Sequence, residues 1–420
     1  MNSEQSADVV VVGSGMAGLC AALTAAENGL RVIVLERMET IGGTTRLSDG
    51  ILNSYDPKRQ GAVQIEDSPE KHLADMLRTG RSRNHRNLAE TLCYEAYPAV
   101  SWLESMSFAF AERVEQVSGA PYPRCHRPRA GKGDAYIDFL AKKLEKIGRT
   151  RILTGICATD ILRDFQTGKV IGLAASAGSE RLRFSAQHGV VLAHGGFQAN
   201  RKMLSKFSPM LTGVEFEGAA GCCGELLSAA QDIDAQAVNT GYFVWETSLR
   251  IGRSVLLRPE QFILVNDLGR RFCREDLQFD ALGERILQQP GHHAWCVSPH
   301  LTGMDPVPFS NKALSDSITE YNKSVTLGQD RLFGKSADFL KPLAGKLGVV
   351  KADVLVKTTL GGLLVNEKAQ VLDRSGLPIR GLTAAGDAVG GIFGCWSSVG
   401  DNLAAAAVFG RLAGQTVSAS

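Results

Sequence analysis

The sequence predicts an α/β protein built on a doubly wound parallel sheet, with an inserted α+β segment in its second half. The first observation is a strand, a glycine-rich loop, a helix and a second strand in order over residues 7–36. The second is a pair of apolar strands that end in glycines, at 189–196 and 381–387. The third is a change at 241–343, where aromatic residues, prolines and charges become more frequent and Gly and Ala rarer.

The size and composition of the chain indicate its general class. Its 420 residues are enough for two domains, and hydrophobic and charged fractions of 44% and 21% are those of a globular protein. A net charge of +2 gives no reason to expect nucleic acid as a partner. No apolar run is long enough to span a bilayer, and the polar first residues predict no secretory signal.

The nine cysteines are scattered, and no C-x-x-C pair occurs among them. This spacing disfavours a zinc site, an iron–sulfur cluster, attached haem and a disulfide framework, so we expect no metal. Reduced thiols are typical of the cytoplasm, where we expect the protein to reside.

An opening strand, a loop and a helix form the clearest signal for ligand binding. Ala7–Val12 is a β-branched run that predicts a buried parallel strand. Small residues after the loop predict a helix that stops at Asn28-Gly29, and Arg31–Leu35 predicts a second strand. This order of elements is that of a βαβ nucleotide-binding unit.

The loop between strand and helix, Gly13–Gly18, has the pattern G-x-G-x-x-G. Gly13 allows the tight turn, Gly15 lets the backbone approach a pyrophosphate, and Gly18 lets the helix lie against the strand. The helix N-terminus offers N–H groups and a partial positive charge to the phosphates. Glu36 lies 18 residues past Gly18, the usual position of a carboxylate that binds a ribose hydroxyl. The sequence therefore predicts a dinucleotide site.

Later segments are expected to lie at the same ligand. Gly42-Gly43-Thr44-Thr45 has little side chain and two hydroxyls, so as a loop it can wrap a flat group closely. Gly189–Gly196 predicts a buried strand ending in glycines, in which His194 is more typical of packing than of chemistry. Asp387 follows a strand and a glycine, and residues 402–412 predict an Ala-rich helix.

The other expected elements are helices, a meander and a hairpin. A basic, proline-containing loop at 121–134 could meet an anion or lie at the surface. We expect helices within 66–116 and at 135–146, a β-meander within 151–184, and a hairpin at 262–272 inside the inserted segment.

Several motifs occur in an order that resembles a known superfamily. They are the glycine loop, Gly42-Gly43-Thr44, Ala193–Gly196, ILVNDLGRRF (263–272), TLGGLLVN (359–366), GLTAAGD (381–387) and FGRLAG (409–414). Together they resemble the FAD-dependent fumarate reductase and 3-ketosteroid dehydrogenase superfamily. The resemblance implies a Rossmann-like, glutathione-reductase-type FAD domain at 1–240 and 344–420, with a mobile α+β cap domain at 241–343.

FAD is therefore the expected cofactor. Asp387 is placed to bind a ribityl hydroxyl, and the N-terminus of the closing helix is placed to face the flavin's pyrimidine edge. The expected FAD contacts are Gly13, Ser14, Gly15, Met16, Ala17, Gly18, Glu36, Arg37, Gly42, Gly43, Thr44, Thr45, Ser48, Gly50, Cys157, Ala193, Gly195, Gly196, Gly386, Asp387, Asn402 and Leu403.

The substrate positions depart from both branches of the superfamily. Thr358 stands where soluble fumarate reductases have a histidine, Phe279 aligns near their proton-donating arginine, and the loop 395–399 lacks their substrate-binding arginine. These differences argue against fumarate as the substrate. Phe279 and Trp396 replace two tyrosines of the ketosteroid dehydrogenases, whereas Gly400 matches the glycine whose backbone binds the carbonyl oxygen. The resemblance thus implies a small, cyclic ketone or keto acid rather than a steroid.

The expected reaction is α,β-dehydrogenation of a CH–CH bond beside a carbonyl. A base removes the proton α to the carbonyl, flavin N5 takes a hydride from the β-carbon, and the backbone of Gly400 stabilises the enolate-like charge. Phe279 and Trp396 shape the pocket. The favoured acid/base is Tyr122, followed by His126, with Tyr55, Tyr242 and Glu246 as alternatives.

Two other interpretations stay open. Ene reduction of an unsaturated acid uses the same parts in reverse. In either direction, the candidates for holding a carboxylate are Arg124, Arg127, Arg129, Arg250 and Arg258. A flavin-bound electron-transfer subunit without its own substrate is the second. No further strand–G-x-G-x-x-G unit occurs, so we expect no nicotinamide-binding domain, and the electron acceptor or donor is left open.

Overall fold

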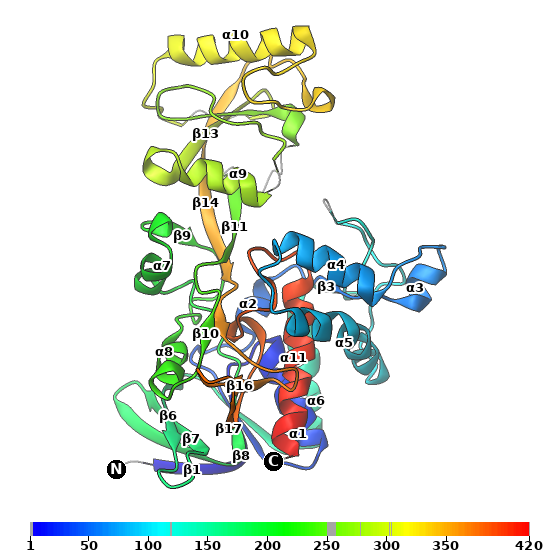
Figure 1. Cartoon of the computed structure of the whole chain (residues 1–420), viewed down its shortest axis with the longest axis vertical. Coiled ribbons are helices and arrows are strands. Elements are labelled where there is room, and N and C mark those ends of the chain that lie inside the picture. Colours follow the sequence, from blue (N-terminus) through cyan, green and yellow to red (C-terminus); the bar gives the residue numbers. More distant parts are fainter. Residues whose placement is uncertain are drawn as a thin grey trace. The chain divides into compact units, whose positions relative to one another are not determined.

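The computed structural model describes residues 3–117, 120–249, 258–277, 279–301, 303 and 305–419. The chain forms two compact units, which are described separately (Figure 1). The first unit comprises residues 1–203, 218–243 and 358–420, and the second comprises residues 204–217 and 244–357. The predicted insert at 241–343 falls in the second unit apart from its first residues, 241–243. Residues 204–217 and 344–357, which were predicted in the FAD domain, also belong to the second unit.

A parallel sheet forms the centre of the first unit. Its strands lie in the order β17 (Pro378–Ala384), β8 (Glu180–Leu192), β1 (Ser3–Val12), β2 (Val32–Leu35) and β5 (Thr150–Leu153). Val9–Val12 pair with Val32–Leu35 on one side and with Gly189–Leu192 on the other, and the valines of β1 are buried. A strand that is covered on both faces is a continuous apolar run, which is why these strands were recognisable. The predicted doubly wound α/β fold is confirmed.

Antiparallel strands extend this sheet. β16 (Gln370–Leu372) pairs with β17, while β6 (Cys157–Arg163) and β7 (Val170–Ala177) form a meander with β8. The turn between β6 and β7 is closed by a hydrogen bond of 2.9 Å from the Gly168 N–H to the Asp164 carbonyl. The predicted meander and its turn are therefore confirmed.

Two helices at opposite ends of the sequence pack closely in the first unit. α1 (Met16–Glu27) lies against α11 (Asp401–Ser418), and both are rich in small buried residues. A Cβ on Gly410 would lie 2.5 Å from the carbonyl oxygen of Ala17, so the small side chains serve the close approach of the helices. The predicted closing helix is present and longer than expected.

The region expected to be helical from 66 to 116 contains two separate helices. α4 (Pro69–Thr79) and α5 (Arg86–Ser105) are divided by a turn in which Arg81 and Ser82 have positive φ. After α5 the chain turns at Met106 and Ser107, and Phe110 forms a β-bridge with Pro128. The helical expectation is therefore wrong beyond residue 105, because pairing with a distant segment overrides local propensity.

The remaining elements of the first unit are short, apart from one helix. α6 (Gly133–Ile147) follows the basic loop and packs beside α1. β3 (Leu52–Asn53) pairs with β4 (Cys125–His126), and β10 (Ala237–Val238) pairs with β15 (Gly362–Leu363). The short helices are α2 (Gly43–Leu47), α3 (Pro57–Gly61), α8 (Glu225–Asp232) and, at the junction with the second unit, α7 (Arg201–Phe207).

The second unit is built on its own sheet. Its strands run in the order β11 (Phe243–Leu249), β14 (Gly348–Thr359), β13 (His293–Ser298) and β12 (Ile263–Val265), with β9 (Glu215–Phe216) paired to β14. The predicted hairpin at 262–272 is closed by a bond of 3.0 Å from the Asn266 N–H to the Arg270 carbonyl. The helices of this unit are α9 (Phe279–Leu287) and α10 (Asn311–Leu327).

A buried charged cluster lies beside the core of the second unit. Arg271 donates two hydrogen bonds of 2.9 Å to Glu275 and lies 2.8 Å from Asp330. The Lys335 ammonium lies 3.1 Å from Glu275, and its side chain is fully buried. Burial lowers the pKa of Lys335, and the charge of Glu275 opposes that shift. The cluster thus places two cations and two anions out of contact with water.

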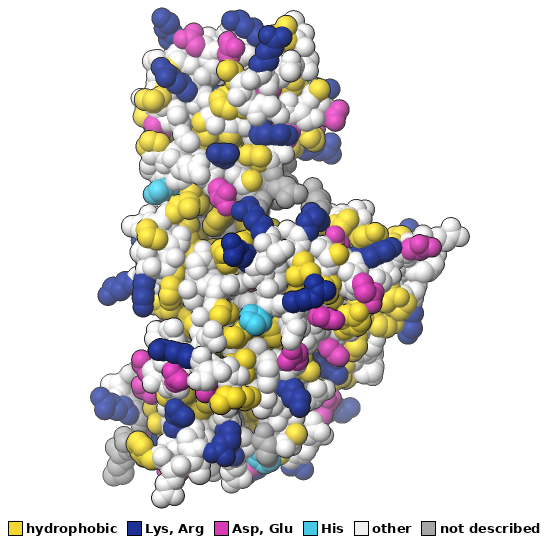
Figure 2. All heavy atoms as spheres, in the orientation of Figure 1, with side chains coloured by type: hydrophobic (Ala, Val, Ile, Leu, Met, Phe, Trp, Pro, Cys, Tyr) yellow, Lys and Arg dark blue, Asp and Glu magenta, His cyan; other side chains and the backbone are white. Residues whose placement is uncertain are grey.

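The surface carries charges of both signs. On the face shown in Figure 2, Lys and Arg side chains lie among Asp and Glu side chains. Within the described residues, no helix combines the length and apolar character needed to cross a membrane. No group of three or more His, Cys, Asp or Glu side chains in the same residues is arranged to hold a metal ion.

Candidate functional site

The carboxyl ends of β1, β2, β8 and β17 lie along one edge of the central sheet, because these strands are parallel neighbours. The loops that leave this edge contain Gly13–Gly15, Glu36, Ala193–Gly196 and Gly386-Asp387. Ligands of open α/β sheets bind outside the carboxyl ends of the strands, where the strand order reverses. In this sheet the strand order reverses at β1, because β2 follows on one side of β1 and β8 is added later on the other side.

The glycine loop after β1 combines tight packing with one open position. A Cβ on Gly13, which has φ of +101°, would lie 2.1 Å from the carbonyl oxygen of Ala193. A Cβ on Gly18 would lie 1.9 Å from the carbonyl oxygen of Gly13. The atoms nearest to a Cβ on Gly15 are 3.7 Å away. Protein packing therefore requires Gly13 and Gly18, whereas Gly15 leaves room at the N-terminus of α1.

Glu36 ties three backbone segments together. Its Oε2 accepts hydrogen bonds from the Ser14 N–H (3.1 Å) and hydroxyl (2.5 Å), and its Oε1 accepts from the Met38 N–H (2.9 Å). The Ser14 hydroxyl oxygen also accepts from the Gly42 N–H at 3.1 Å. A carboxylate offers about four acceptor positions, so one is left for a ribose hydroxyl. Glu36 thus holds the glycine loop and the segment after β2 in place, and it is also the predicted ribose ligand.

The segment after Glu36, expected to be a loop that wraps the cofactor, is partly helical. Residues 43–47 form α2. Gly42, the N-cap residue that precedes this helix, has φ of +119°. The Thr45 hydroxyl oxygen accepts from the N–H of Met16, the first residue of α1, at 3.2 Å. The Ser48 hydroxyl donates to the Thr45 carbonyl at 2.8 Å and closes the turn. These bonds fasten α2 to the start of α1 and explain why the segment is helical.

Asp387 joins the end of β17 to two other elements. Its carboxylate accepts from the Thr358 hydroxyl at 2.6 Å and from the Asn402 side chain at 3.3 Å. Burial raises the pKa of Asp387, and these two hydrogen bonds oppose that shift. The fold thus brings together Asp387 and Asn402, which were both predicted to contact the cofactor. Asp387 also accepts a hydrogen bond from the Thr358 hydroxyl.

The N-terminus of α11 lies beside β3. Gly400 has φ of +96° and precedes the first turn, which has no side-chain cap. Its carbonyl accepts from the Asn53 N–H at 3.1 Å, and the Asn53 side chain donates to the Val399 carbonyl at 2.7 Å. A Cβ on Gly400 would lie 2.8 Å from Asn53 Oδ1. The backbone at 399–400 is therefore held closely by Asn53.

Sequence reasoning missed Asn53, His72 and Asp401 as members of this site. The Asp401 carboxylate accepts from the Asn53 side chain at 3.0 Å and lies 3.0 Å from His72 Nε2. These partners are 348 and 329 positions apart in the chain. Local spacing carries no signal of such contacts, so only a fold could reveal them.

The end of β8 is closely packed. The Phe197 N–H donates to the Thr359 hydroxyl at 3.3 Å, which joins this end to the end of β14. Burial lowers the pKa of His194 to about 4, so its ring is neutral at physiological pH. This agrees with the packing interpretation of His194.

The basic loop at 121–134 pairs its cations within the first unit. The buried Arg124 guanidinium donates to Asp67 at 2.5 and 2.7 Å and to Asp75 at 2.7 Å. Arg127 donates to Glu115 at 2.6 Å. The third arginine, Arg129, lies 3.6 Å from Glu112 and is exposed. Arg124 is thus a structural cation, which corrects the expectation that it holds a substrate carboxylate.

Tyr122 and His126 lie at the start of this loop. The Tyr122 ring has Lys71 at 5.2 Å and Arg124 at 5.0 Å from its centroid. His126 is buried, with its Nε2 3.0 Å from Asp56 and its Nδ1 3.1 Å from the Arg124 carbonyl. Burial alone would raise the pKa of Asp56, but hydrogen bonds from His126 and Arg59 outweigh it and hold that pKa well below its ordinary value. Both ring nitrogens of His126 thus face acceptors.

Other predicted positions fall on several elements. The Arg37 guanidinium donates to Glu225 at 2.7 Å, and the Thr44 hydroxyl lies 3.6 Å from the Cys222 sulfur. Cys157 begins β6, Trp396 is half-buried in the loop before α11, and Leu403 is buried in α11. Phe279 begins α9, and its side chain lies outside the described residues, as does that of Glu246.

Two alternative acid/base residues occupy different surroundings. The Tyr55 ring lies 6.3 Å from the Tyr97 ring, centroid to centroid. A hydrogen bond with Cys395 raises the pKa of Tyr242, whose carbonyl accepts from the Leu360 N–H at 2.9 Å. Tyr242 is therefore linked to both the TLGG segment and the loop before α11.

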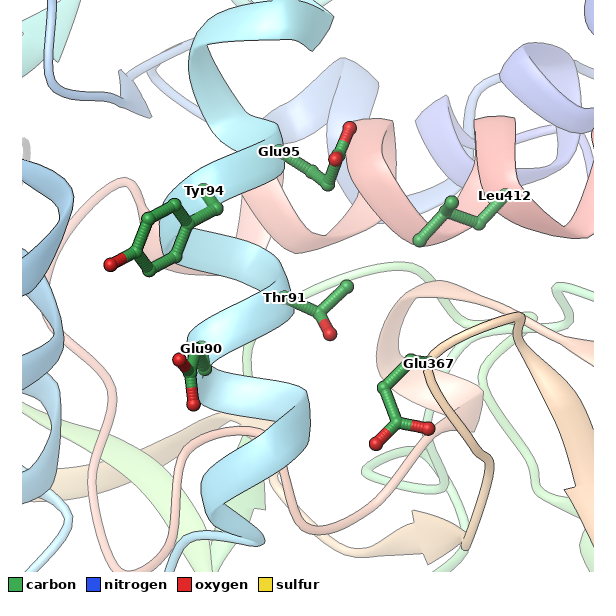
Figure 3. Close-up of a pocket in the computed structure, with 6 residues that line it drawn as sticks. All are labelled: Glu90, Thr91, Tyr94, Glu95, Glu367 and Leu412. Atoms are coloured by element: carbon green, nitrogen blue, oxygen red, sulfur yellow. The ribbon is translucent and has the colours of Figure 1, made fainter.

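A surface hollow between α5 and α11 is separate from the strand-end site (Figure 3). Leu412 lies eleven residues beyond Asp401, which is about 16 Å along a helix axis. The hollow is lined by Glu90, Thr91, Tyr94, Glu95, Glu367 and Leu412. None of these side chains was predicted to bind the cofactor.

The donors and spaces at the strand ends suit FAD. Gly15 leaves room at a helix N-terminus, where a diphosphate is favoured by free N–H groups and the helix dipole. Glu36 and Asp387 supply carboxylate acceptors at the ends of β2 and β17, as two sets of sugar hydroxyls require. The residues present therefore fit the expected group.

Comparison with known proteins agrees with this fit. The family model described as FAD binding domain matches residues 8–402. A urocanate reductase of Eggerthella lenta is 30% identical, over 98% of this chain and 74% of its own length.

Solved structures show the same fold. A flavocytochrome c3 fumarate reductase in its open conformation has a TM-score of 0.86 at 26% identity, covering 99% of this chain and 78% of that one. A 3-ketosteroid-delta4-(5alpha)-dehydrogenase from Rhodococcus jostii, in complex with 4-androstene-3,17-dione, has a TM-score of 0.80 at 26% identity, covering 100% and 98%. The chain belongs to the FAD binding domain family, within the superfamily of FAD-dependent CH–CH oxidoreductases that contains the fumarate reductases and 3-ketosteroid dehydrogenases.

Proposed function

We propose that this enzyme dehydrogenates the CH–CH bond next to the carbonyl of a small, cyclic ketone or keto acid. The supporting observation is the first turn of α11, where Gly400 has no side chain and Asn53 holds the adjoining backbone. Thr358 stands at the position of a histidine in the fumarate reductases. Its hydroxyl donates a hydrogen bond to Asp387. These features favour a neutral carbonyl over a dicarboxylate.

Separate residues of the chain bind the cofactor and the substrate in this proposal. Bound FAD supplies the acceptor for a hydride. The glycine loop and α1 hold its diphosphate, and Glu36 and Asp387 accept hydrogen bonds from its sugar hydroxyls. The Gly400 N–H binds the substrate carbonyl oxygen and stabilises the charge that develops there. Trp396, in the loop before α11, is proposed to contribute an apolar wall to the substrate site, and the proposed role of Phe279 falls on a side chain outside the described residues.

The acid/base is proposed to be Tyr122, with His126 as the second candidate. The Tyr122 ring lies near two cations, with Lys71 at 5.2 Å and Arg124 at 5.0 Å from the ring centroid. His126 is the weaker candidate, because Asp56 and the Arg124 carbonyl already occupy its ring nitrogens.

The second candidate function is ene reduction of an unsaturated acid, the same chemistry in reverse. The similarity of the chain to a urocanate reductase and a fumarate reductase favours this direction. Oxygen, a quinone or a partner protein is proposed to exchange electrons with the flavin. Free thiols at all nine cysteines support a reducing compartment such as the cytoplasm.

Turnover with small ring compounds tests the proposed reaction. The purified protein is incubated with 4-oxocyclohexane carboxylic acid and an artificial electron acceptor, and in parallel with cyclic enones or enoates and a reduced dye. Dye reduction with the saturated ketone supports dehydrogenation, whereas dye oxidation only with the unsaturated acid would assign ene reduction. No turnover in either direction would favour a flavin-bound electron-transfer subunit.

Bound FAD and the role of Glu36 form one prediction. The purified protein is expected to be yellow and to release FAD on acid or heat treatment. Glu36→Ala is expected to weaken FAD binding by roughly 1–3 kcal/mol, because a hydrogen bond to a charged group is lost. Titration of the apoprotein with FAD measures this change.

Ser14→Ala is the matched control for Glu36. It removes the bond of 2.5 Å to the carboxylate but leaves the carboxylate available to the ribose. If Ser14→Ala weakens FAD binding as much as Glu36→Ala, the loss arises from the loop and not from a ribose contact. A colourless protein that takes up no FAD would contradict the cofactor assignment.

We propose that the second unit acts as a mobile cap. The chain passes between the units at four places, near residues 203, 217, 243 and 357. Closure would exclude water from the flavin during hydride transfer. Hydrogen exchange at these connections is expected to slow when FAD and a cyclic enone are both bound, and equal exchange with and without the enone would argue against a cap.

A further inference from the structure

A buried polar network links α4, β3 and α11 in the first unit. Its members are His72, Asn53 and Asp401, and the side chains of His72 and Asp401 are each 2% exposed. Asp401 Oδ1 lies 3.0 Å from His72 Nε2 and 3.0 Å from Asn53 Nδ2. The other ring nitrogen of His72 has no hydrogen-bond partner among the described residues.

Asp401 is the first residue of α11, so its negative charge lies within the turn whose N–H groups the proposed function assigns to the flavin and the carbonyl. A helix N-terminus favours anions, and a carboxylate placed in its first turn satisfies that preference itself. Asp401 therefore reduces the positive potential that the α11 terminus offers to a ligand.

Two cysteine thiols lie close enough to Asp401 for its charge to affect their pKa. Burial and the charge of Asp401 both raise the pKa of Cys93, which lies on α5. Burial, followed by the charge of Asp401, raises the pKa of Cys125 on β4 to about 11. Arg124 opposes the shift at Cys93. Asp401 therefore lies near side chains of α5 and β4 in addition to its own hydrogen-bond partners.

We propose that Asp401, held in place by the positioning residues His72 and Asn53, lowers the reduction potential of the bound flavin. Reduction places negative charge on the flavin's pyrimidine edge, and a fixed anion in the adjoining helix turn disfavours that charge. The inference rests on the proposed function only in placing that edge at the α11 terminus. A lower potential favours electron donation by the flavin, which is the direction of the second candidate function, ene reduction, and opposes the dehydrogenation proposed first.

The test is the midpoint potential of the FAD-loaded protein, measured by equilibration with redox dyes and without substrate. Asp401→Asn removes the charge but keeps the shape and an acceptor for His72. We expect the two-electron reduction to become at least tenfold more favourable, which is an upward shift of about 30 mV or more. His72→Gln keeps a side-chain donor to Asp401 and is expected to leave the potential low.

A matched control separates a local effect from a change of net charge. Glu70→Gln removes one negative charge from the exposed first turn of α4, the helix that carries His72. It is expected to move the potential by less than a third of the Asp401→Asn shift. If Asp401→Asn loses FAD, Asp401→Ser replaces it with the same expectation, because serine is favoured at helix N-termini.

The outcomes distinguish this inference from the proposed function. An unchanged or lower potential in Asp401→Asn, or an equal shift in Glu70→Gln, would overturn the inference even if the enzyme turns over cyclic ketones. Failure to find a substrate would leave the measured potentials valid. A low potential that rises in Asp401→Asn but not in the control supports the inference in either case.

Discussion

Gly400→Val is expected to lower turnover at least about 100-fold while FAD remains bound. A side chain at 400 would meet Asn53 Oδ1 at 2.8 Å and Ile51 at 3.0 Å, so Asn53 or the backbone at 399–401 must move. The φ of +96° adds backbone strain of about 1–3 kcal/mol for any residue with a Cβ. Loss of one donor to a developing oxyanion costs about 10²–10³ in kcat. Steady-state kinetics and the flavin spectrum measure the two expected results.

Gly376→Val is the matched control for this substitution. Gly376 also has positive φ, +79°, but a Cβ there would meet no atom within 4 Å. It lies in the turn between β16 and β17, away from the strand ends that form the site. The control therefore carries the backbone strain without the crowding, and its turnover is expected to stay near that of the wild type. Full turnover of Gly400→Val with flavin bound would mean that the substrate carbonyl is held elsewhere.

Glu275→Gln is expected to destabilise the second unit by about 3–5 kcal/mol, the range for breaking a buried ion pair from one side. Glu275 is the shared partner of Arg271 and Lys335 and also accepts from the Leu264 N–H at 3.2 Å. Glutamine would leave two buried cations with Asp330 as their remaining carboxylate in the cluster. Chemical denaturation followed by hydrogen exchange of the β13 amides measures the free energy of unfolding for this unit.

The loss of stability in Glu275→Gln is expected to depend on pH. Burial lowers the pKa of Lys335, and removing Glu275 is expected to lower it further. The unfolded state then binds more protons than the folded state, so the stability deficit should shrink as pH rises toward the ordinary lysine pKa. A deficit that grows with pH would contradict this account.

Glu320→Gln provides the exposed comparison for Glu275. Glu320 lies 3.6 Å from Lys323 on α10, and both side chains are more than half exposed. Its loss is expected to change stability by less than about 0.5 kcal/mol, since solvent screens such pairs. If Glu275→Gln costs no more than Glu320→Gln, the buried cluster makes no net contribution to stability.

The sequence alone was sufficient for the parts of this protein whose signals are local. The apolar runs of β1, β2 and β8 predicted buried parallel strands, because strands covered on both faces must be apolar along their whole length. The glycine spacing at 13–18 predicted the loop and α1. Gly13 and Gly18 pack closely against backbone atoms, and Gly15 leaves room at the N-terminus of the helix. The fold class and the family followed from these elements and their order.

The site needed tertiary structure where residues distant in sequence meet. Gly42–Leu47 became a helix rather than a loop because Thr45 bonds to the start of α1. Arg124 became a buried structural cation because Asp67 and Asp75 converge on it from an earlier segment.

The network of Asn53, His72 and Asp401 joins positions separated by as many as 348 residues. Residue types and spacing determined that this protein has a flavin-binding scaffold, because each strand or turn carries its own pattern. Only the fold decided that these three polar side chains meet, because hydrogen bonds depend on distance in space and not on position in the chain.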